Sequence, residues 1–255
     1  MGRIIAVANQ KGGVGKTTTS VNLAASLAFF KHKVLLVDLD PQGNATMGSG
    51  VDKHELNLSA CESILGECKV EEASVHSEQA GFDVLPSNSD LTAAEVDLMS
   101  VAMKEKRLKL ALSTVKDRYD YILIDCPPTL NMLTVNALVA ADGVLIPLQT
   151  EYYALEGLSS LLKTIEQVQD HLNADLQIEG ILRTMHDLRN NLANQVSTQL
   201  ISHFGNQVFK TIIPRNVRVA EAPSHGLPIL KYDSASRGAI AYHALASELM
   251  RKYKK

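Results

Sequence analysis

Two lysines lie five positions apart in one glycine-rich stretch, NQKGGVGKTTT, which spans residues 9–19. A stretch of this kind between a strand and a helix binds phosphate, because its glycines let backbone N–H groups point inward and the helix adds its positive N-terminal end. We therefore expect phosphate contacts at Gly12, Gly13, Val14 and Gly15. One lysine is enough for the phosphates of one nucleotide, so the second lysine needs an explanation of its own.

The residues that follow Gly15 carry the side chains that binding of a nucleotide with Mg²⁺ requires. Lys16 is expected to neutralise the β- and γ-phosphates, and the Thr17 hydroxyl to hold Mg²⁺. Thr18 is expected to reach the α-phosphate. The strict pattern G-x-x-x-x-G-K-[ST] is not met, because Gln10 stands where it has its first glycine. We interpret the stretch as a nucleotide-binding loop rather than an ordinary tight turn.

Aspartates follow two of the apolar runs. Asp38 and Asp40 come at the end of VLLVDLD, and Asp125 ends YILID. Because ligands of open α/β sheets bind at the carboxyl ends of the strands, all three are expected to converge on the loop. Asp125 is expected to hold Mg²⁺ through water, although a strand-end aspartate can also merely cap the next turn. The residues alone leave the separate roles of Asp38 and Asp40 open.

Apolar runs alternate with helical patterns along the whole chain. Runs such as VLLVD are apolar at nearly every position, so both faces of the sheet must be covered. We predict an α/β fold, a doubly wound and mostly parallel sheet with helices on both faces, as a single domain over residues 1–255. The strands are expected near 4–8, 34–38, 82–86, 121–125, 143–147, 178–184 and 208–214, and the helices near 18–30, 104–116, 131–141, 152–172, 191–204 and from about 236. The polar stretch 43–80 is interpreted as a mobile insertion beside the site.

The composition excludes several classes of protein. No run approaches the length of apolar sequence that crosses a membrane, and the N-terminal segment leads straight into the loop, so neither a membrane span nor a cleavable signal is expected. Three cysteines without a CxxC pair favour reduced cytosolic thiols. From Arg183 onward the chain has eleven Lys/Arg and four Asp/Glu, against a net charge of −3 overall. This asymmetry favours a polyanionic partner, although four of these basic residues lie in the last five positions and also suit a solvated helix end.

The stretch KGGVGKTT resembles the deviant Walker A motif of the ParA/MinD family of P-loop ATPases. The similarity continues, in order, through VDLDPQGNAT, YDYILIDCPP, EYYALEGLSSLL and IIPRNVRVAEAPSHGLPI. With no helix-turn-helix segment before the first strand, the sequence is similar to the short, chromosomal ParA/Soj type.

The resemblance implies roles for particular residues. Lys11 would reach across a dimer interface to the nucleotide of the partner subunit, as an arginine finger does. Asp40 would polarise the attacking water, and Asp38 would support the Mg²⁺ shell and the loop lysine. The adenine would lie against Pro214 and Asn216.

The resemblance also implies a function, an ATP- and Mg²⁺-dependent ATPase for the segregation of a chromosome or plasmid. Its ATP-bound homodimer would bind double-stranded DNA without sequence preference, and a ParB/Spo0J-like centromere-binding protein would stimulate hydrolysis. Such a protein is cytoplasmic and nucleoid-associated and needs no membrane. The expected DNA contacts are Arg189, Arg218, Lys231 and Arg237.

Other members of the superfamily are alternatives. A MinD-like division-site ATPase ends in an amphipathic helix that inserts into lipid, whereas AIAYHALASELMRKYKK carries small apolar residues that suit packing. An iron–sulfur reductase of the nitrogenase iron-protein type or an iron–sulfur scaffold ATPase needs positioned cysteine ligands, whereas Cys126 follows Asp125 directly and Cys61 and Cys68 lie in the polar stretch 43–80. An enzyme that activates a small molecule, as in dethiobiotin synthesis, shares the fold but not the PQGN and PRNVR stretches.

Overall fold

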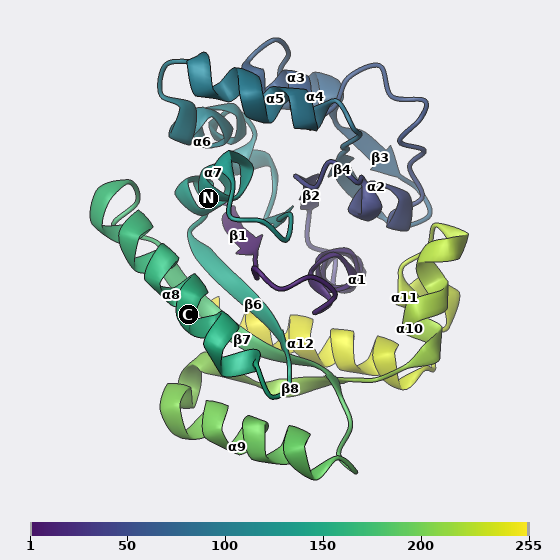
Figure 1. Ribbon diagram of the computed structural model, residues 1–255. Coiled ribbons are helices and arrows are strands. Elements are labelled where there is room, and N and C mark those ends of the chain that lie inside the picture. The colour runs from purple at the N-terminus through teal and green to yellow at the C-terminus, as the bar shows by residue number, and fades with distance from the viewer. Residues whose placement is uncertain (1, 254–255) are drawn as a thin grey trace.

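A computed structural model describes residues 2–253 and contains one sheet in the order β3-β4-β2-β5-β1-β6-β7-β8 (Figure 1). Neighbouring strands run parallel except β3 and β4, which are antiparallel. The prediction of a mostly parallel α/β sheet is confirmed. The strands are β1 (Arg3–Val7), β2 (Val34–Asp38), β3 (Val75–Ser77), β4 (Phe82–Leu85), β5 (Tyr121–Asp125), β6 (Gly143–Gln149), β7 (Gln177–His186) and β8 (Val208–Pro214).

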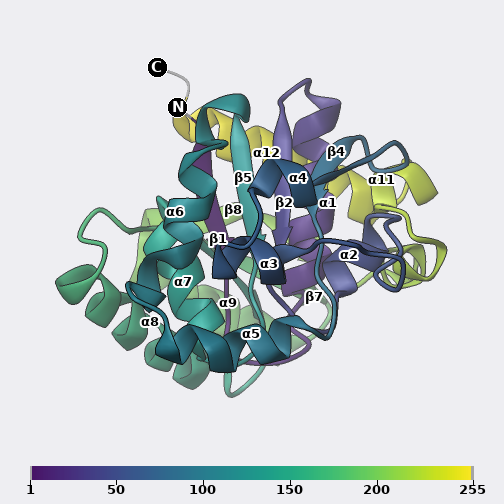
Figure 2. The same ribbon diagram turned by 90° about the horizontal axis from the view of Figure 1, so that it is seen from above.

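Helices cover both faces of the sheet, as Figures 1 and 2 show from two directions. Side chains alternate along β1, so that Ile4 and Ala6 pack into one apolar cluster and Ile5 and Val7 into the other. The first cluster takes residues from α3 (Ala60–Leu65), α4 (Val70–Ala73), α5 (Leu91–Asp97), α6 (Arg107–Ser113), α7 (Met132–Ala140), α8 (Ala154–His171) and α9 (Asn191–Phe204). The second takes residues from α1 (Lys16–Phe29), α2 (Asn44–Gly48), α10 (Val217–Glu221), α11 (Ile229–Tyr232) and α12 (Arg237–Tyr253). Short 3-10 turns cover 98–100, 104–106, 116–118, 205–207 and 222–225.

The expected elements lie close to the observed ones, but the interpretation of 43–80 as a mobile insertion is wrong. Ile64 and Val70 within this stretch are almost fully buried in the first cluster. Helix α3 begins with a capping box, in which Ser59 accepts a hydrogen bond from the backbone and Glu62 accepts one from the backbone of Ser59. The polar composition therefore belongs to helix caps and turns, and the stretch also supplies the edge strand β3.

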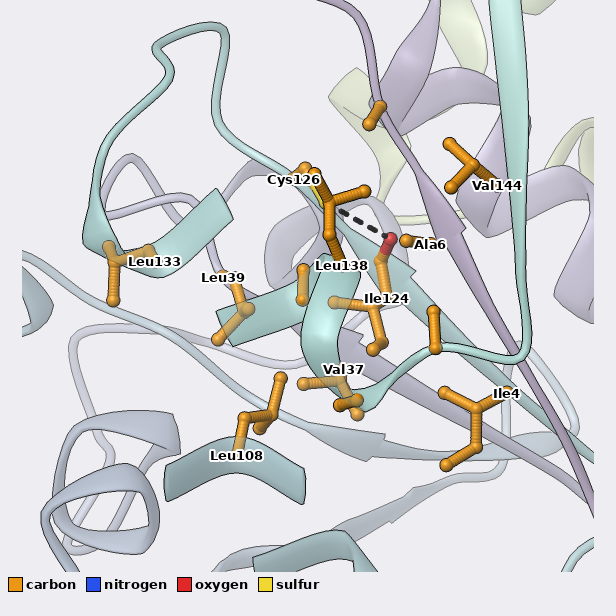
Figure 3. Close-up of a cluster of buried hydrophobic side chains, with 14 of the residues drawn as sticks. Ile4, Ala6, Val37, Leu39, Leu108, Ile124, Cys126, Leu133, Leu138 and Val144 are labelled. Atoms are coloured by element: carbon orange, nitrogen blue, oxygen red, sulfur yellow. Dashed lines mark hydrogen bonds between the residues drawn. The ribbon is translucent and has the colours of Figure 1, made fainter. Parts of the chain in front are cut away.

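The cysteines take part in packing. Figure 3 shows Cys126 among the apolar side chains of the first cluster, where its thiol donates to the Ile124 carbonyl across 3.8 Å. Burial raises the pKa of the Cys126 thiol and raises the pKa of Cys61 to about 11, so both thiols stay protonated at neutral pH. Among residues 2–253, no helix is both long and apolar enough to cross a membrane.

Candidate functional site

The carboxyl ends of three neighbouring strands bring the predicted residues together. In the parallel register, Asp125 at the end of β5 lies beside Val7 of β1 on one side and beside Asp38 of β2 on the other. The glycine-rich loop leaves β1 at this edge and leads into α1. The loop and both aspartates therefore meet at one edge of the sheet, where α/β proteins bind ligands.

The backbone of the glycine-rich loop presents N–H groups that can donate hydrogen bonds to a ligand. Gly13 and Gly15 have φ angles of 72° and 88°, in the left-handed region that favours glycine. Gly15 occupies the N-cap position of α1 but has no side chain that could accept a hydrogen bond from the first turn. The amides of residues 15–18 donate to no acceptor within the described part of the chain. Thr184 fixes the loop from outside by donating its hydroxyl to the Val14 carbonyl across 2.7 Å. Gly12 lies exposed at the tip. An uncapped helix N-terminus behind a fixed loop is an anion site.

The two lysines of the loop point to different places. Lys16 is only 7% exposed, and its Nζ donates to the Lys11 carbonyl across 3.1 Å. Burial lowers the pKa of Lys16, and the charges of Asp125 and Asp40 oppose this shift. The Lys11 Nζ lies outside the loop, 2.7 Å from the Glu151 carboxylate, with a side chain that is 41% exposed. Only Lys16 is directed to the phosphate position of its own subunit.

A buried carboxylate lies directly behind the start of α1. Asp125 accepts hydrogen bonds from the hydroxyls of Thr17 and Ser20, each across 2.8 Å. Burial, followed by the charge of Asp38, raises the pKa of Asp125, because two carboxylates out of water repel each other. A hydroxyl and buried carboxylates are the oxygen ligands that Mg²⁺ prefers, so Thr17, Asp125 and Asp38 fit this ion. The sequence prediction missed Ser20, whose signal was its spacing of one helical turn from Lys16.

Asp38 and Asp40, which sequence left unseparated, differ in their surroundings. Asp38 is fully buried and accepts from the backbone amide and the hydroxyl of Thr46, each across 2.8 Å, and from the Asp40 amide across 3.1 Å. Burial raises the pKa of Asp38. Asp40 is half-buried, and one of its oxygens accepts from the Gln42 amide across 3.0 Å. Asp38 therefore holds the turn that presents Asp40 at the open side of the site.

An apolar cavity of about 340 Å³ adjoins the loop. Gly15 and Thr18 line it on the loop side, and Pro214 and Asn216 line it on the other side. The Asn216 side chain caps α10 by accepting from the Val219 amide across 3.2 Å. The cavity therefore lies where the base of a nucleotide would lie if its phosphates occupied the loop.

The four predicted DNA contacts do not form one group. Arg189 and Arg237 line a second cavity, of about 510 Å³, together with Arg215, which the sequence prediction did not include. Arg218 lies elsewhere and is paired with Glu221 across 3.0 Å and with Asp233 across 3.8 Å. A further candidate, Lys231 on α11, is exposed and lies outside this cavity.

Comparisons with known proteins identify the family of this chain. Residues 2–178 match a family model described as an AAA domain. The chain is 54% identical to the sporulation initiation inhibitor protein Soj of Bacillus subtilis, over 98% of both chains. It is 52% identical to the chromosome partitioning protein ParA of Myxococcus xanthus, over 99% of this chain and 89% of the relative. The chain belongs to the ParA/Soj family.

Solved structures extend the comparison. This ParA/Soj chain is 39% identical, with a TM-score of 0.88, to cobyrinic acid a,c-diamide synthase from Mycobacterium smegmatis with a bound ATP analogue and magnesium, over 100% of this chain and 97% of that one. It is 27% identical, with a TM-score of 0.81, to the cell division ATPase MinD from Pyrococcus furiosus, over 99% and 100% of the two chains. The ParA/Soj chain is an ATPase, and its cofactors are ATP and Mg²⁺.

Proposed function

We propose that this protein is a DNA-segregation ATPase that works as a single domain in the cytoplasm, on the nucleoid. ATP closes a homodimer, the dimer binds double-stranded DNA without sequence preference, and a ParB/Spo0J-like centromere-binding protein stimulates hydrolysis and release. Relatives named Soj and chromosome partitioning protein ParA support this assignment, with identities of 54% and 52%. The excess of basic residues after Arg183 supports a polyanionic partner.

The observation that carries the proposal is that the side chains of the two loop lysines point to different places. The Lys11 ammonium pairs with Glu151 at the surface, whereas the buried Lys16 ammonium faces the loop. An exposed ion pair of this kind stabilises by about 0–1 kcal/mol, so releasing Lys11 costs little. A second cation is useful at the phosphates only if it arrives from a neighbouring subunit, in the manner of an arginine finger.

The other residues divide the remaining work. Lys16 and the amides at the start of α1 hold the phosphates, and Pro214 and Asn216 lie against the adenine. Thr17, Asp125 and Asp38 hold Mg²⁺, which neutralises phosphate charge when it is bound. Asp40 orients the attacking water, because its position at the open side of the site leaves one carboxylate oxygen without a hydrogen bond from residues 2–253.

A membrane-surface function of the MinD kind is less well supported. Helix α12 turns Tyr242, Leu245 and Leu249 into the second cluster, where they are almost fully buried. These three bulky side chains are therefore used for packing and are not free to enter lipid, while Ile240 and Tyr253 are the large apolar side chains of α12 that stay exposed.

The proposed function is tested by offering the protein random-sequence duplex DNA and anionic liposomes, each with ATP, with ADP and without nucleotide. We expect binding to DNA with ATP and much weaker binding with ADP, and no binding to the liposomes. The Asp40→Ala variant serves to prolong the ATP state. Nucleotide-dependent binding to liposomes without binding to DNA would contradict the proposal.

A further inference from the structure

Three arginines from separate parts of the chain line the cavity of about 510 Å³. Arg189 lies before α9, Arg215 follows β8, and Arg237 begins α12. One carboxylate, Asp187, lines the cavity with them. Burial, followed by the charge of Arg183, lowers the pKa of the neighbouring His186, so this ring is neutral at neutral pH. The lining therefore has an excess of positive charge.

The three guanidinium groups are not equally free. Arg189 donates to both oxygens of Asp187, across 3.0 and 2.8 Å, so its charge is largely compensated. Arg215 and Arg237 are exposed and form no ion pair with any residue between 2 and 253. The uncompensated charge of the cavity therefore lies on these two side chains.

Arg215 also belongs to the wall of the apolar cavity beside the nucleotide loop. Pro214 and Arg215 line both cavities, so one short segment separates them. The backbone amide of Arg215 donates to the His186 carbonyl across 3.4 Å, and this bond joins the segment to the end of β7. Met185 of that strand lines the apolar cavity with a φ angle of 48°, a costly conformation for a residue with a side chain.

We propose that Arg215 and Arg237 bind phosphates of duplex DNA in this cavity, and that a base in the adjoining cavity positions Arg215 for this contact. The proposal deepens the proposed function, because it names residues and a nucleotide dependence for the DNA contact. A planar guanidinium matches the geometry of a phosphate, and two such groups in an open cavity suit the closely spaced phosphates of a duplex. The base acts by packing against Pro214 and Arg215, the short segment that lines both cavities.

The test compares Arg215→Ala and Arg215→Lys with Lys163→Ala, a matched control that removes one exposed charge from α8, away from the cavity. Affinity for random-sequence duplex DNA is measured against salt, with a saturating non-hydrolysable ATP analogue and without nucleotide. Light scattering verifies that each variant forms the dimer. One lost phosphate contact per subunit lowers the salt slope by about 1.8 and the affinity roughly 60-fold at 0.1 M salt.

With the analogue, we expect this loss for Arg215→Ala, a wild-type slope for Arg215→Lys, and wild-type behaviour for Lys163→Ala. Without nucleotide, Arg215→Ala and the wild type should bind DNA equally weakly. If Arg215→Ala matches the wild type with the analogue, or if Lys163→Ala loses as much, the assignment of Arg215 is wrong. An equal loss with and without nucleotide overturns the dependence on the base.

The outcomes also separate this inference from the proposed function. A wild type that binds no DNA with the analogue contradicts the proposed function itself. A wild type that binds DNA while Arg215→Ala does the same overturns only the inference. If the substitution lowers binding to anionic vesicles and not to DNA, the cavity binds lipid headgroups and the inference is overturned as well.

Discussion

The Thr17 hydroxyl donates to the Asp125 carboxylate across 2.8 Å, and this bond joins the start of α1 to the end of β5. Its two partners come from different motifs, one from the nucleotide loop and one from an apolar strand. Both the hydroxyl and the carboxylate are ligands that suit Mg²⁺, so this bond marks the place where we propose that the ion binds.

Asp125→Asn is expected to weaken Mg²⁺-dependent ATP binding and, at the same time, to stabilise the protein without nucleotide. Burial raises the folded-state pKa of Asp125 to about 8, above its unfolded value, so at neutral pH the buried carboxyl must take up a proton when the chain folds. This cost is complete above the folded pKa and is relieved progressively as the pH falls from there toward the unfolded pKa. A neutral amide removes the penalty. The unfolding temperature of Asp125→Asn without Mg²⁺ should exceed that of the wild type by about 2–4 °C for each 1 kcal/mol by which the free energy of unfolding increases.

Two controls accompany this prediction. Unfolding of the wild type at lower pH should show the same direction of change. A lower unfolding temperature for Asp125→Asn without Mg²⁺ would mean that the bonds to Thr17 and Ser20 outweigh the repulsion between the carboxylates.

Lys16→Ala is expected to abolish nucleotide binding. Its ammonium is the one that faces the loop, and the substitution leaves the phosphates with backbone amides alone. Calorimetry with ATP and Mg²⁺ measures the loss, and circular dichroism checks that the fold is intact. ATP affinity within a few-fold of the wild type would rule out the loop as the phosphate site.

Lys11→Ala is expected to keep ATP binding but lose hydrolysis and dimerisation, since we propose that Lys11 acts on the nucleotide of the partner. Glu151→Gln is the control for the surface ion pair, and it should change the free energy of unfolding by less than about 1 kcal/mol. Loss of ATP binding in Lys11→Ala would show that Lys11 acts in its own subunit.

Asp40→Ala is expected to accumulate the ATP-bound dimer. The attacking water loses the carboxylate that orients it, while the phosphate contacts of Lys16 and the loop remain. Size-exclusion chromatography with ATP should show a dimer that persists, whereas the wild type returns to a monomer as ATP is consumed. An Asp40→Ala variant that stays monomeric with ATP argues against this role.

Much of the fold follows from local pattern, because apolar runs such as 34–38 and 121–125 must be buried on both faces. The sequence wrongly indicates a mobile insertion at 43–80 because many of its polar residues belong to helix caps and turns. The apolar residues that anchor this stretch in the core, such as Ile64, are few and widely spaced along it. The loop and the strand-end aspartates were found from sequence because each is contiguous with its element.

The basic surface was harder to predict because it depends on contacts between distant segments. Arg215, Arg189 and Arg237 meet only through the packing of β7, β8 and α12. The pairing of Arg218 with Asp233 joins α10 to the residue after α11, and no local pattern predicts it. Arg215 lies between Pro214 and Asn216, the two residues expected to contact the adenine, and no local pattern marks its side chain as part of the basic surface.

The central claim, that Lys11 completes the site of the partner subunit, is tested most directly by mixing Lys11→Ala with Asp40→Ala before ATP is added. Each variant alone should be inactive. In a mixed dimer, the site of the Lys11→Ala subunit keeps its own Asp40 and receives Lys11 from the other subunit, so an equal mixture should recover ATPase activity, up to the value of about a quarter of the wild-type rate that random pairing gives. If Lys11 acts within its own subunit, both sites of the mixed dimer lack an essential residue. A mixture as inactive as the separate variants would contradict the account.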